Sequence, residues 1–417
     1  MIVVFGPLEP DKSKYNTNST SVAVNCIPVA DGWAPTQLLA PVSDALADEP
    51  RGLTLARTST GGYQIYAGTE TNLYKLDTTT VPYPWEDVSR LVGGAYALPP
   101  GDQWSFVRYG SRLLGFELAD SPQFIDVDSG TDFANLPNAP LARFGWVAGD
   151  FLVAGYNTSF PNRVRWSAFN NSEAWELQVR GASLQDINYG NEVQGGIGSE
   201  DGAIVFQRNA ISAMQKTLDV SAAFSFQVVN QYRGTIAPYS LAVAGAGLIF
   251  YLSEDGFYMG GQGQPIGAEK IDRWFLNEEI DRDYLQEVTA AVDPFSKIVW
   301  FAYRKVDGSK ARIGYHWQLD RWCYSDINVT QIAALATPGL TWDGLDGLYA
   351  TIDDVDQPYD SRLFAGGRPT MAGFDADTYR LGWFTGDNAA VTLESADAAL
   401  SVSKAGKPQR TFLTGAR

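Results

Sequence analysis

Short apolar runs typical of β-strands recur along this chain at intervals of roughly 40 to 50 residues, and no linker divides the series. They begin near Leu53, Trp104, Trp146, Ala203, Gly247, Ile298 and Leu348. Several are followed by a turn and a second run, as at Asp307 and Gly308. The 41 glycines and the 13% aromatic content favour pleated, turn-rich structure. We predict an all-β fold, a β-propeller of about six to seven blades; two β-sandwiches in tandem are the alternative with similar strand spacing.

The chain divides into three predicted parts. Residues 1–50 form an N-terminal extension or strand arm, residues 51–390 the propeller, and residues 391–417 a C-terminal strand pair and tail. Between 268 and 285 apolar residues stand near helical spacing, which predicts a short inserted amphipathic helix. Its apolar side either covers the propeller rim or packs against another subunit.

One isolated strand is predicted near the N-terminus. Between Ser21 and Ile27, Val22, Val24 and Cys26 alternate with smaller or polar residues. A single strand must join an existing sheet. It therefore either closes the fold on itself or pairs with a neighbouring subunit.

The net charge of −17 restricts the possible partners. An acidic surface repels phosphate backbones, which disfavours ordinary nucleic-acid binding, and docking on anionic lipid needs basic clusters. The same charge suits a surface that DNA passes without adsorbing. Cys26 and Cys323 form no CxxC pair, so we expect two separate buried thiols. No uninterrupted apolar window of about 18 residues is present, so no membrane span is predicted.

Few residues suggest catalysis. His316 is the one histidine and stands in a strand-like run, which indicates a structural role. The chain carries no GxSxG, HExxH or GxxxxGK[ST] motif. The densest acidic cluster lies between 353 and 360, either as a calcium-binding loop or as an acidic surface loop; its members are Asp353, Asp354, Asp356 and Asp360. We expect no catalytic residue, metal or cofactor.

The stretch FPNRVRWSAFNNSEAWE, residues 160–176, interleaves arginine with tryptophan. In a strand, Arg163 and Arg165 share one face, and Val164 and Trp166 share the other. This pattern predicts a half-buried strand with solvated arginines. A tight turn at Asn170 and Asn171 would then let Trp175 pack back on the strand.

The part NRVRWSAFNNSEAWE resembles a recurrent signature of β-propeller tail proteins from short-tailed bacteriophages. Further stretches are similar to the same family: 29–33, 115–127, 254–267 and 270–275. The residues that carry the resemblance are Trp33, Arg163, Arg165, Trp166, Trp175, Asp255, Gly256, Trp274 and Phe275. The likeness extends over most of residues 20–395 and concerns tail hub, or nozzle, proteins that stabilise packaged DNA.

The resemblance implies a structural virion protein. It implies a homohexameric ring in the virion tail, below the portal and adaptor, that is assembled in the host cytoplasm. Its other implied partners are further tail proteins, namely fibres or spikes and a distal tip. Double-stranded DNA would pass through the lumen without specific binding. The N-terminal strand and the inserted helix would contact neighbouring subunits, and the candidate interface residues are Val22, Val24, Ile27, Ile271 and Trp274.

Two other function classes fit the same composition. A propeller-fold glycoside hydrolase or lyase would use paired carboxylates at the central mouth, with Asp353 and Asp354 as candidates. A cytosolic propeller scaffold would bind protein partners, although no repeated consensus supports it. The physical hypothesis preferred here is seven small sheets around an axis with acidic walls that let a polyanion pass.

Overall fold

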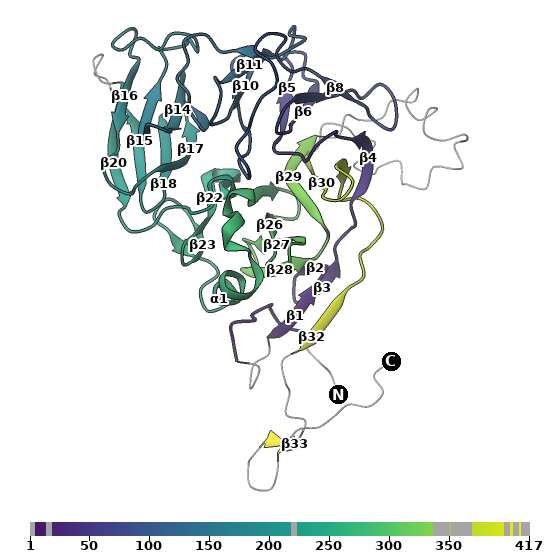
Figure 1. Ribbon diagram of the computed structural model, residues 1–417. Helices are drawn as coiled ribbons and strands as arrows, with labels where there is room; N and C mark the ends of the chain where they lie inside the picture. The colour runs from purple at the N-terminus through teal and green to yellow at the C-terminus, as the bar shows by residue number, and fades with distance from the viewer. Residues whose placement is uncertain are drawn as a thin grey trace.

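The computed structural model describes residues 5–13, 19–217, 223–336, 351, 369–395, 401–402 and 408–409. Strands dominate these residues, and seven sheets are arranged around one axis (Figure 1). First strands of neighbouring sheets contact one another, for example β13 with β17 and β25 with β29, and the contact of β29 with β5 closes the ring. The prediction of a propeller is confirmed, with seven blades. Because the sheets share one ring, the alternative of tandem sandwiches is wrong.

The blades are numbered in chain order from the first strand that follows the N-terminal segment. Blade 1 contains β5 (Leu53–Arg57), β6 (Tyr63–Gly68), β7 (Leu73–Leu76) and β8 (Trp85–Asp87); blade 2 contains β9 (Ser105–Tyr109), β10 (Arg112–Phe116), β11 (Gln123–Asp126) and β12 (Ala134–Asn135); blade 3 contains β13 (Phe144–Ala148), β14 (Phe151–Asn157), β15 (Phe160–Trp166) and β16 (Ser183–Asp186); blade 4 contains β17 (Val193–Ser199), β18 (Gly202–Gln207), β19 (Ile211–Lys216) and β20 (Phe224–Asn230). Blade 5 contains β21 (Ala242–Ala244), β22 (Leu248–Ser253), β23 (Gly256–Met259) and β24 (Gln264–Pro265); blade 6 is built on β25 (Thr289–Asp293), β26 (Ile298–Arg304), β27 (Lys310–His316) and β28 (Arg321–Ser325); blade 7 contains β29 (Val329–Ala336), β30 (Pro369–Asp375), β31 (Arg380–Trp383) and β4 (Ala40–Ala45).

Blade 7 joins the two halves of the chain. Its outermost strand, β4, comes from the predicted N-terminal extension and pairs antiparallel with β31, with Ala45 opposite Arg380 and Pro41 opposite Gly382. On its other side β4 contacts blade 1, where the Asp44 amide donates to the Tyr83 carbonyl at 2.9 Å. The strand therefore closes the ring from both sides, and its pairing with β31 links residues more than 300 positions apart.

Blade 6 is wider than the others because both ends of the chain add a strand to it. β1 (Thr20–Val24) lies parallel to β28, and β32 (Thr392–Ser395) pairs antiparallel with β1. Figure 1 shows these two strands side by side. Both sides of β1 are thus occupied within its own chain. The proposal that this strand is added to a neighbouring subunit is corrected accordingly.

Four further short strands complete the fold. β2 (Cys26–Val29) and β3 (Gly32–Pro35) form a hairpin beside blade 6, and β33 (Ser401–Val402) pairs with β34 (Pro408–Gln409) near the C-terminus. The predicted C-terminal strand pair is thus present.

Aromatic side chains of one blade sit against glycines of the blade before or after it. At each of these glycines an added Cβ would lie closer than 3.0 Å to a ring atom, so only glycine leaves room for the ring. The pairs are Trp104 on Gly68, Phe116 on Gly145, and Trp146 on Gly196, which join blades 1 to 2, 2 to 3 and 3 to 4. Together with the branched side chains around them, these rings form the cores between the sheets.

Three of the residues that were predicted to begin a repeating unit lie at the second strand of a blade instead of the first. Ala203, Gly247 and Ile298 mark the second strand of blades 4, 5 and 6, or its edge, rather than the first. The second strand has a neighbour on each side and is covered on both faces, so it is the most apolar run of its blade. The first strands near the axis read VQGGIGS, AVA and TAAVD, which is a weaker signal. Leu348 lies outside the described residues.

The inserted helix is shorter and less regular than predicted. It consists of α1 (Asp272–Trp274) followed by a π-helical turn, η3 (Phe275–Glu279), and then a 3-10 segment, η4 (Arg282–Glu287). Ile271 and Phe275 are fully buried in the core that blades 5 and 6 share. The segment thus covers the propeller, as the simpler interpretation predicted. The two other short 3-10 segments are η1 (Pro238–Ser240) and η2 (Gly245–Gly247).

Candidate functional site

The Arg/Trp segment of residues 160–176 builds part of blade 3. The Arg163 guanidinium forms a two-pronged ion pair with Asp186 on the neighbouring strand, at 2.6 and 2.8 Å. Arg165 donates to the Trp175 carbonyl, and Trp166 is buried with its indole N–H on the Gly181 carbonyl at 2.8 Å. The predicted burial of Val164 and Trp166 is confirmed. The arginines, however, are engaged within the blade instead of solvated, so they present no free cation pair to nucleic acid or sugar.

Trp175 packs back as predicted. Its side chain is buried between blades 2 and 3, and its indole N–H donates to the Ser172 carbonyl at 2.7 Å. Asn170 has a positive φ of 50° in the turn, a conformation that asparagine tolerates better than most residues. The segment therefore forms a local scaffold that positions one large aromatic ring.

Two other signature stretches meet at one carboxylate. Asp272, from α1, accepts a hydrogen bond from the Phe257 amide at 3.1 Å. Gly256 has a φ of +143°, and a Cβ there would lie 2.2 Å from an Asp272 carboxylate oxygen. Burial raises the pKa of Asp272 to about 7. Residues 254–259 and 270–275 thus hold each other in place through glycine, amide and carboxylate.

The remaining signature residues around this point are also structural. Asp255 pairs with Arg233 at 3.1 Å and accepts from the Tyr258 hydroxyl at 2.8 Å. The Trp274 amide donates to the Asp11 carboxylate at 2.7 Å, so the N-terminal segment caps α1. Phe275 packs 4.8 Å from Phe257, centroid to centroid.

The predicted interface residues have different surroundings. Val22 and Val24 are half-buried on β1, and Ile27 is half-buried on β2. Trp33 lies under the Arg321 guanidinium, 4.7 Å from its ring centroid, and Trp274 packs edge-on against Tyr324. Ile271 is 0% exposed within its own chain, so it is wrong as an interface residue. The interface roles of Val22, Val24, Ile27 and Trp274 stay predictions.

One end of the propeller axis is closed by polar side chains. The Gln103 side-chain amide, at the start of blade 2, donates to the Gln286 carbonyl, at the start of blade 6, at 2.7 Å. The Tyr239 hydroxyl, which precedes blade 5, donates to Asp102 at 2.7 Å. Arg143, which precedes blade 3, adds two bonds of 2.8 Å to the same carboxylate oxygen. Because these bonds connect blades on opposite sides of the ring, no duplex passes along the axis, which corrects the picture of a DNA path inside one propeller.

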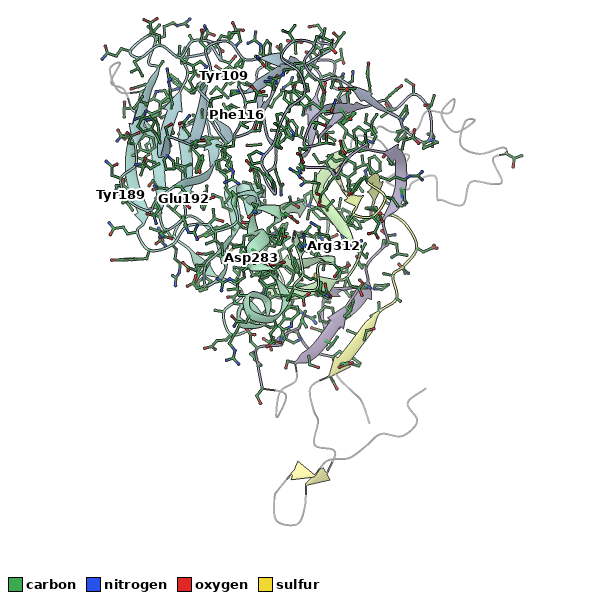
Figure 2. The ribbon with its side chains drawn as sticks, in the orientation of Figure 1. Tyr109, Phe116, Tyr189, Glu192, Asp283 and Arg312 are labelled. Atoms are coloured by element: carbon green, nitrogen blue, oxygen red, sulfur yellow. The ribbon has the colours of Figure 1, made fainter. Side chains whose placement is uncertain are left out.

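A shallow polar cavity lies beside the polar side chains that close the axis. Its lining includes Arg143, Glu192 and Arg208, and Glu192 forms an ion pair with Arg208 at 3.2 Å. In Figure 2, Glu192 lies inward of Tyr189 at the outer edge of the molecule. A glycosidase needs two carboxyl groups facing one bond. This cavity, as the described residues line it, offers a single carboxylate between two arginines.

The other predicted chemical candidates are buried, half-buried or outside the described residues. Burial lowers the pKa of His316, whose Nδ1 accepts from the Leu319 amide at 3.2 Å. Cys26 and Cys323 are buried and free, and burial raises the pKa of Cys26 to about 12, so the expectation of buried thiols is confirmed. The acidic cluster 353–360 lies outside the described residues. Within the part of the chain that the structure describes, no group of three or more His, Cys, Asp or Glu side chains is placed to hold a metal ion.

A buried arginine that the sequence pattern did not indicate as functional lies in a cavity of about 580 Å³ between blades 6 and 7. Arg312 on β27 is 1% exposed and is labelled inside the body of the molecule in Figure 2. Its guanidinium lies over Phe384 and Trp300, 3.6 and 4.4 Å from the ring centroids. The one available signal was a charged residue in the apolar run ARIGYH. A strand pattern shows that such a residue is unusual but not which elements will cover it.

Among the described residues, no helix combines the length and apolar character needed to cross a bilayer.

Neither the known family models nor the curated proteins contain a match to this chain. Three solved structures illustrate its structural likenesses. The extracellular domain of a putative one component system from B. thetaiotaomicron is 12% identical with a TM-score of 0.47, over 87% of this chain and 40% of that one. A chain of the mitotic checkpoint complex is 10% identical with a TM-score of 0.44, over 86% and 98%.

The computationally designed Ika8 protein is 9% identical with a TM-score of 0.41, over 83% of this chain and 99% of that one. This chain spans about 40% of the length of the B. thetaiotaomicron protein. At these identities and TM-scores, the likenesses carry no argument about function.

Proposed function

We propose that this chain is a structural virion protein, a tail hub or nozzle subunit of a short-tailed bacteriophage that forms part of the DNA-ejection channel. The sequence resemblance motivates the proposal, and the outer edge of blade 6 is the observation that carries it. There strands from near both ends of the chain widen one sheet, and its outermost strand offers an edge to which a second copy can add a strand. In this role the protein retains packaged DNA by position and charge and breaks no bond.

The assembly edge is β32. Within the described residues β32 pairs with β1 on one side only, and Thr392 and Glu394 are exposed. The Ser21 hydroxyl bonds the Glu394 carbonyl at 3.2 Å, so the backbone groups of Glu394 face β1. Because strand residues alternate, those of Leu393 face the open edge. A strand from a second copy placed there gains main-chain hydrogen bonds, which is the general mode of β-strand addition.

The DNA path in this proposal runs between copies and not through a propeller. The axis of each copy is bridged from Gln103 to Gln286. Six copies carry on the order of a hundred negative charges, given −17 for each chain. Repulsion between such walls and phosphates acts over about 8 Å at physiological salt. DNA is thereby kept from adsorbing while it moves.

The assembly claim is tested by mass photometry and negative-stain imaging of the purified chain, alone and with the adaptor protein of its particle. Rings of about six times 45.5 kDa are expected with the adaptor. Leu393→Pro removes an edge N–H and should lower the ring fraction at least tenfold. Leu393→Ala, which loses the same side chain but keeps the N–H, should assemble. A wild-type chain that stays monomeric under both conditions contradicts the proposal.

The enzymatic alternative is separated by a polysaccharide screen. The chain with Asp353→Asn and Asp354→Asn is compared with the wild-type chain, because these were the candidate acids. Under the proposed function neither protein releases reducing ends or unsaturated products. Turnover by the wild-type chain that the double variant lacks would favour the hydrolase or lyase instead.

A further inference from the structure

The cavity around Arg312 lies where three parts of the chain converge. Blade 6 provides Arg312, Ile298 and Trp300; blade 7 and the residues after it provide Met371, Phe384 and Asn388; the N-terminal hairpin and the residues after it provide Ile27 and Thr36. Arg312, Thr36 and Trp300 are buried, whereas Gln37 and Asn388 at the rim are exposed. The bottom of the cavity therefore combines one buried charged side chain with apolar side chains, and its exposed rim is polar.

Arg312 has few partners for a buried cation. Its Nη2 donates to the Thr36 hydroxyl oxygen at 3.0 Å, and its buried Nε has no hydrogen-bond partner. No carboxylate of the described residues lies within ion-pair distance of the guanidinium. Arg143 provides the contrast, since it is held by Asp102 at 2.8 Å. A buried charge without a counter-charge is costly, and two aromatic faces offset only part of that cost.

Asp293 is the acidic residue that lines the same cavity, but its carboxylate is already committed. Its Oδ1 accepts from the amides of Phe295 and Ser296 at 3.0 and 3.2 Å, and its Oδ2 accepts from the Ser296 hydroxyl at 2.5 Å. The turn after β25 thus uses this carboxylate. Burial lowers the pKa of Arg312 to about 9, and the negative charge of Asp293 raises that pKa only slightly.

The chemistry of the walls defines what would complete the site. A carboxylate would neutralise Arg312 and receive a hydrogen bond from the Thr36 hydroxyl, whose oxygen accepts from Nη2 and whose hydrogen is left to donate. An attached apolar group would contact Ile298, Trp300 and Met371. The volume of about 580 Å³ lies within the usual range of small-molecule sites.

We propose that this cavity binds a small organic anion that carries one carboxylate group on an apolar body. The ligand would lie between the N-terminal hairpin, blade 6 and the segment after blade 7, and so would hold both chain ends against the ring. This inference goes beyond the proposed function and does not rest on it, because the site lies within one chain and its occupancy is measurable on the monomer.

The test compares benzoate, benzamide and inorganic phosphate by thermal shift and isothermal titration calorimetry on the full chain. Benzoate should raise Tm and bind with 1:1 stoichiometry, whereas benzamide, which has the same shape without the charge, should do neither. Arg312→Met should abolish the benzoate shift while leaving the ligand-free Tm unchanged or higher, since an apolar isostere removes the buried charge. Thr36→Val should weaken benzoate binding about tenfold, the effect of one lost hydrogen bond to a charged group.

Arg321→Met is the matched control. Arg321, on β28 of blade 6, also stacks on a tryptophan, Trp33 of the N-terminal hairpin, but it donates to the carbonyls of Gly6, Ala30 and Gly32. Its variant should lose stability and keep the full benzoate shift. Three results would each overturn the proposal. The first is an equal benzoate shift in the wild-type chain and in Arg312→Met. The others are no benzoate binding at about 10 mM, a concentration far above that needed by typical specific sites, and a response to phosphate alone. If Arg312→Met fails to fold, Thr36→Val decides the question by the same comparison.

Discussion

At the residue scale, glycine and buried carboxyl groups show how signature positions hold this fold. Gly256 and Asp272 occupy space that admits no further atom, and they join residues 254–259 to the inserted helix. The residues that carry the phage-tail resemblance are thus packing and hydrogen-bonding residues in this chain. Their positions are explained by contacts within this chain.

Gly256→Ala should destabilise the protein by about 2–5 kcal/mol, because the methyl group meets the Asp272 carboxylate and φ is +143°. Urea unfolding followed by circular dichroism measures the change. Gly110→Ala is the control: its φ is +58°, and a Cβ there has nothing within 4 Å. It should lose only about 1 kcal/mol. Equal losses for the two variants would contradict the steric explanation.

Glu117 should make stability depend on pH. Its side chain is fully buried, and burial raises its pKa to about 7 from an ordinary value of 4.5. Between these two values the folded protein binds more protons than the unfolded chain, so the free energy of unfolding falls as pH rises from about 4.5 to about 7. The expected loss over that window is about 2–3 kcal/mol from this residue.

Denaturation curves at several pH values test this expectation. Glu117→Gln keeps an acceptor for the Ala119 amide, which Glu117 binds at 2.6 Å, and it cannot ionise. The variant should show a flatter pH profile, although Asp272 contributes a change of the same sign. A profile as steep as that of the wild-type chain would show that Glu117 is not the group responsible.

At the scale of elements, β4 is the strand on which the ring depends. It bonds β31 on one side and the Tyr83 region of blade 1 on the other. The seventh sheet would otherwise present an open edge next to the first. The N-terminal segment is therefore a part of the propeller itself, although its sequence resembles that of an appendage.

Asp44→Pro should weaken this closure by about 2 kcal/mol or more, because proline has no amide to donate to the Tyr83 carbonyl. Asp44 is exposed, so Asp44→Ala removes the side chain and keeps the amide. Thermal unfolding and hydrogen exchange of blade 7 and blade 1 provide the readout. If the proline and alanine variants were equally stable, the Asp44–Tyr83 bond would not contribute to closure.

At the scale of the whole molecule, charge sets the behaviour toward DNA. With a net charge of −17, the chain should bind duplex DNA more weakly than about 10⁻⁴ M, the weak limit of ordinary non-specific binding. Fluorescence anisotropy at 50 mM salt, where electrostatic binding would be strongest, measures this. Micromolar affinity with a steep salt dependence would contradict the proposed passage without adsorption.

A variant control separates the acidic body from the basic C-terminal end. Lys404, Lys407, Arg410 and Arg417 are replaced together by glutamine, and the DNA titration is repeated. Any residual binding that disappears in this variant belongs to the basic end. Binding that persists belongs to the propeller and would contradict the argument from charge.

The sequence by itself determined the local chemistry of this protein. Alternating apolar residues, turn dipeptides and a spacing of one blade predicted a propeller, and strand alternation predicted the burial of Val164 and Trp166, because these are properties of residues close together in the chain. Only the tertiary structure decided what distant residues do to one another. The pairing of β4 with β31, the bridge from Gln103 to Gln286 across the axis, and the burial of Arg312 under Phe384 each join residues between 72 and 343 positions apart. Such pairings depend on which sheets become neighbours in space, and no periodicity within one segment contains that information.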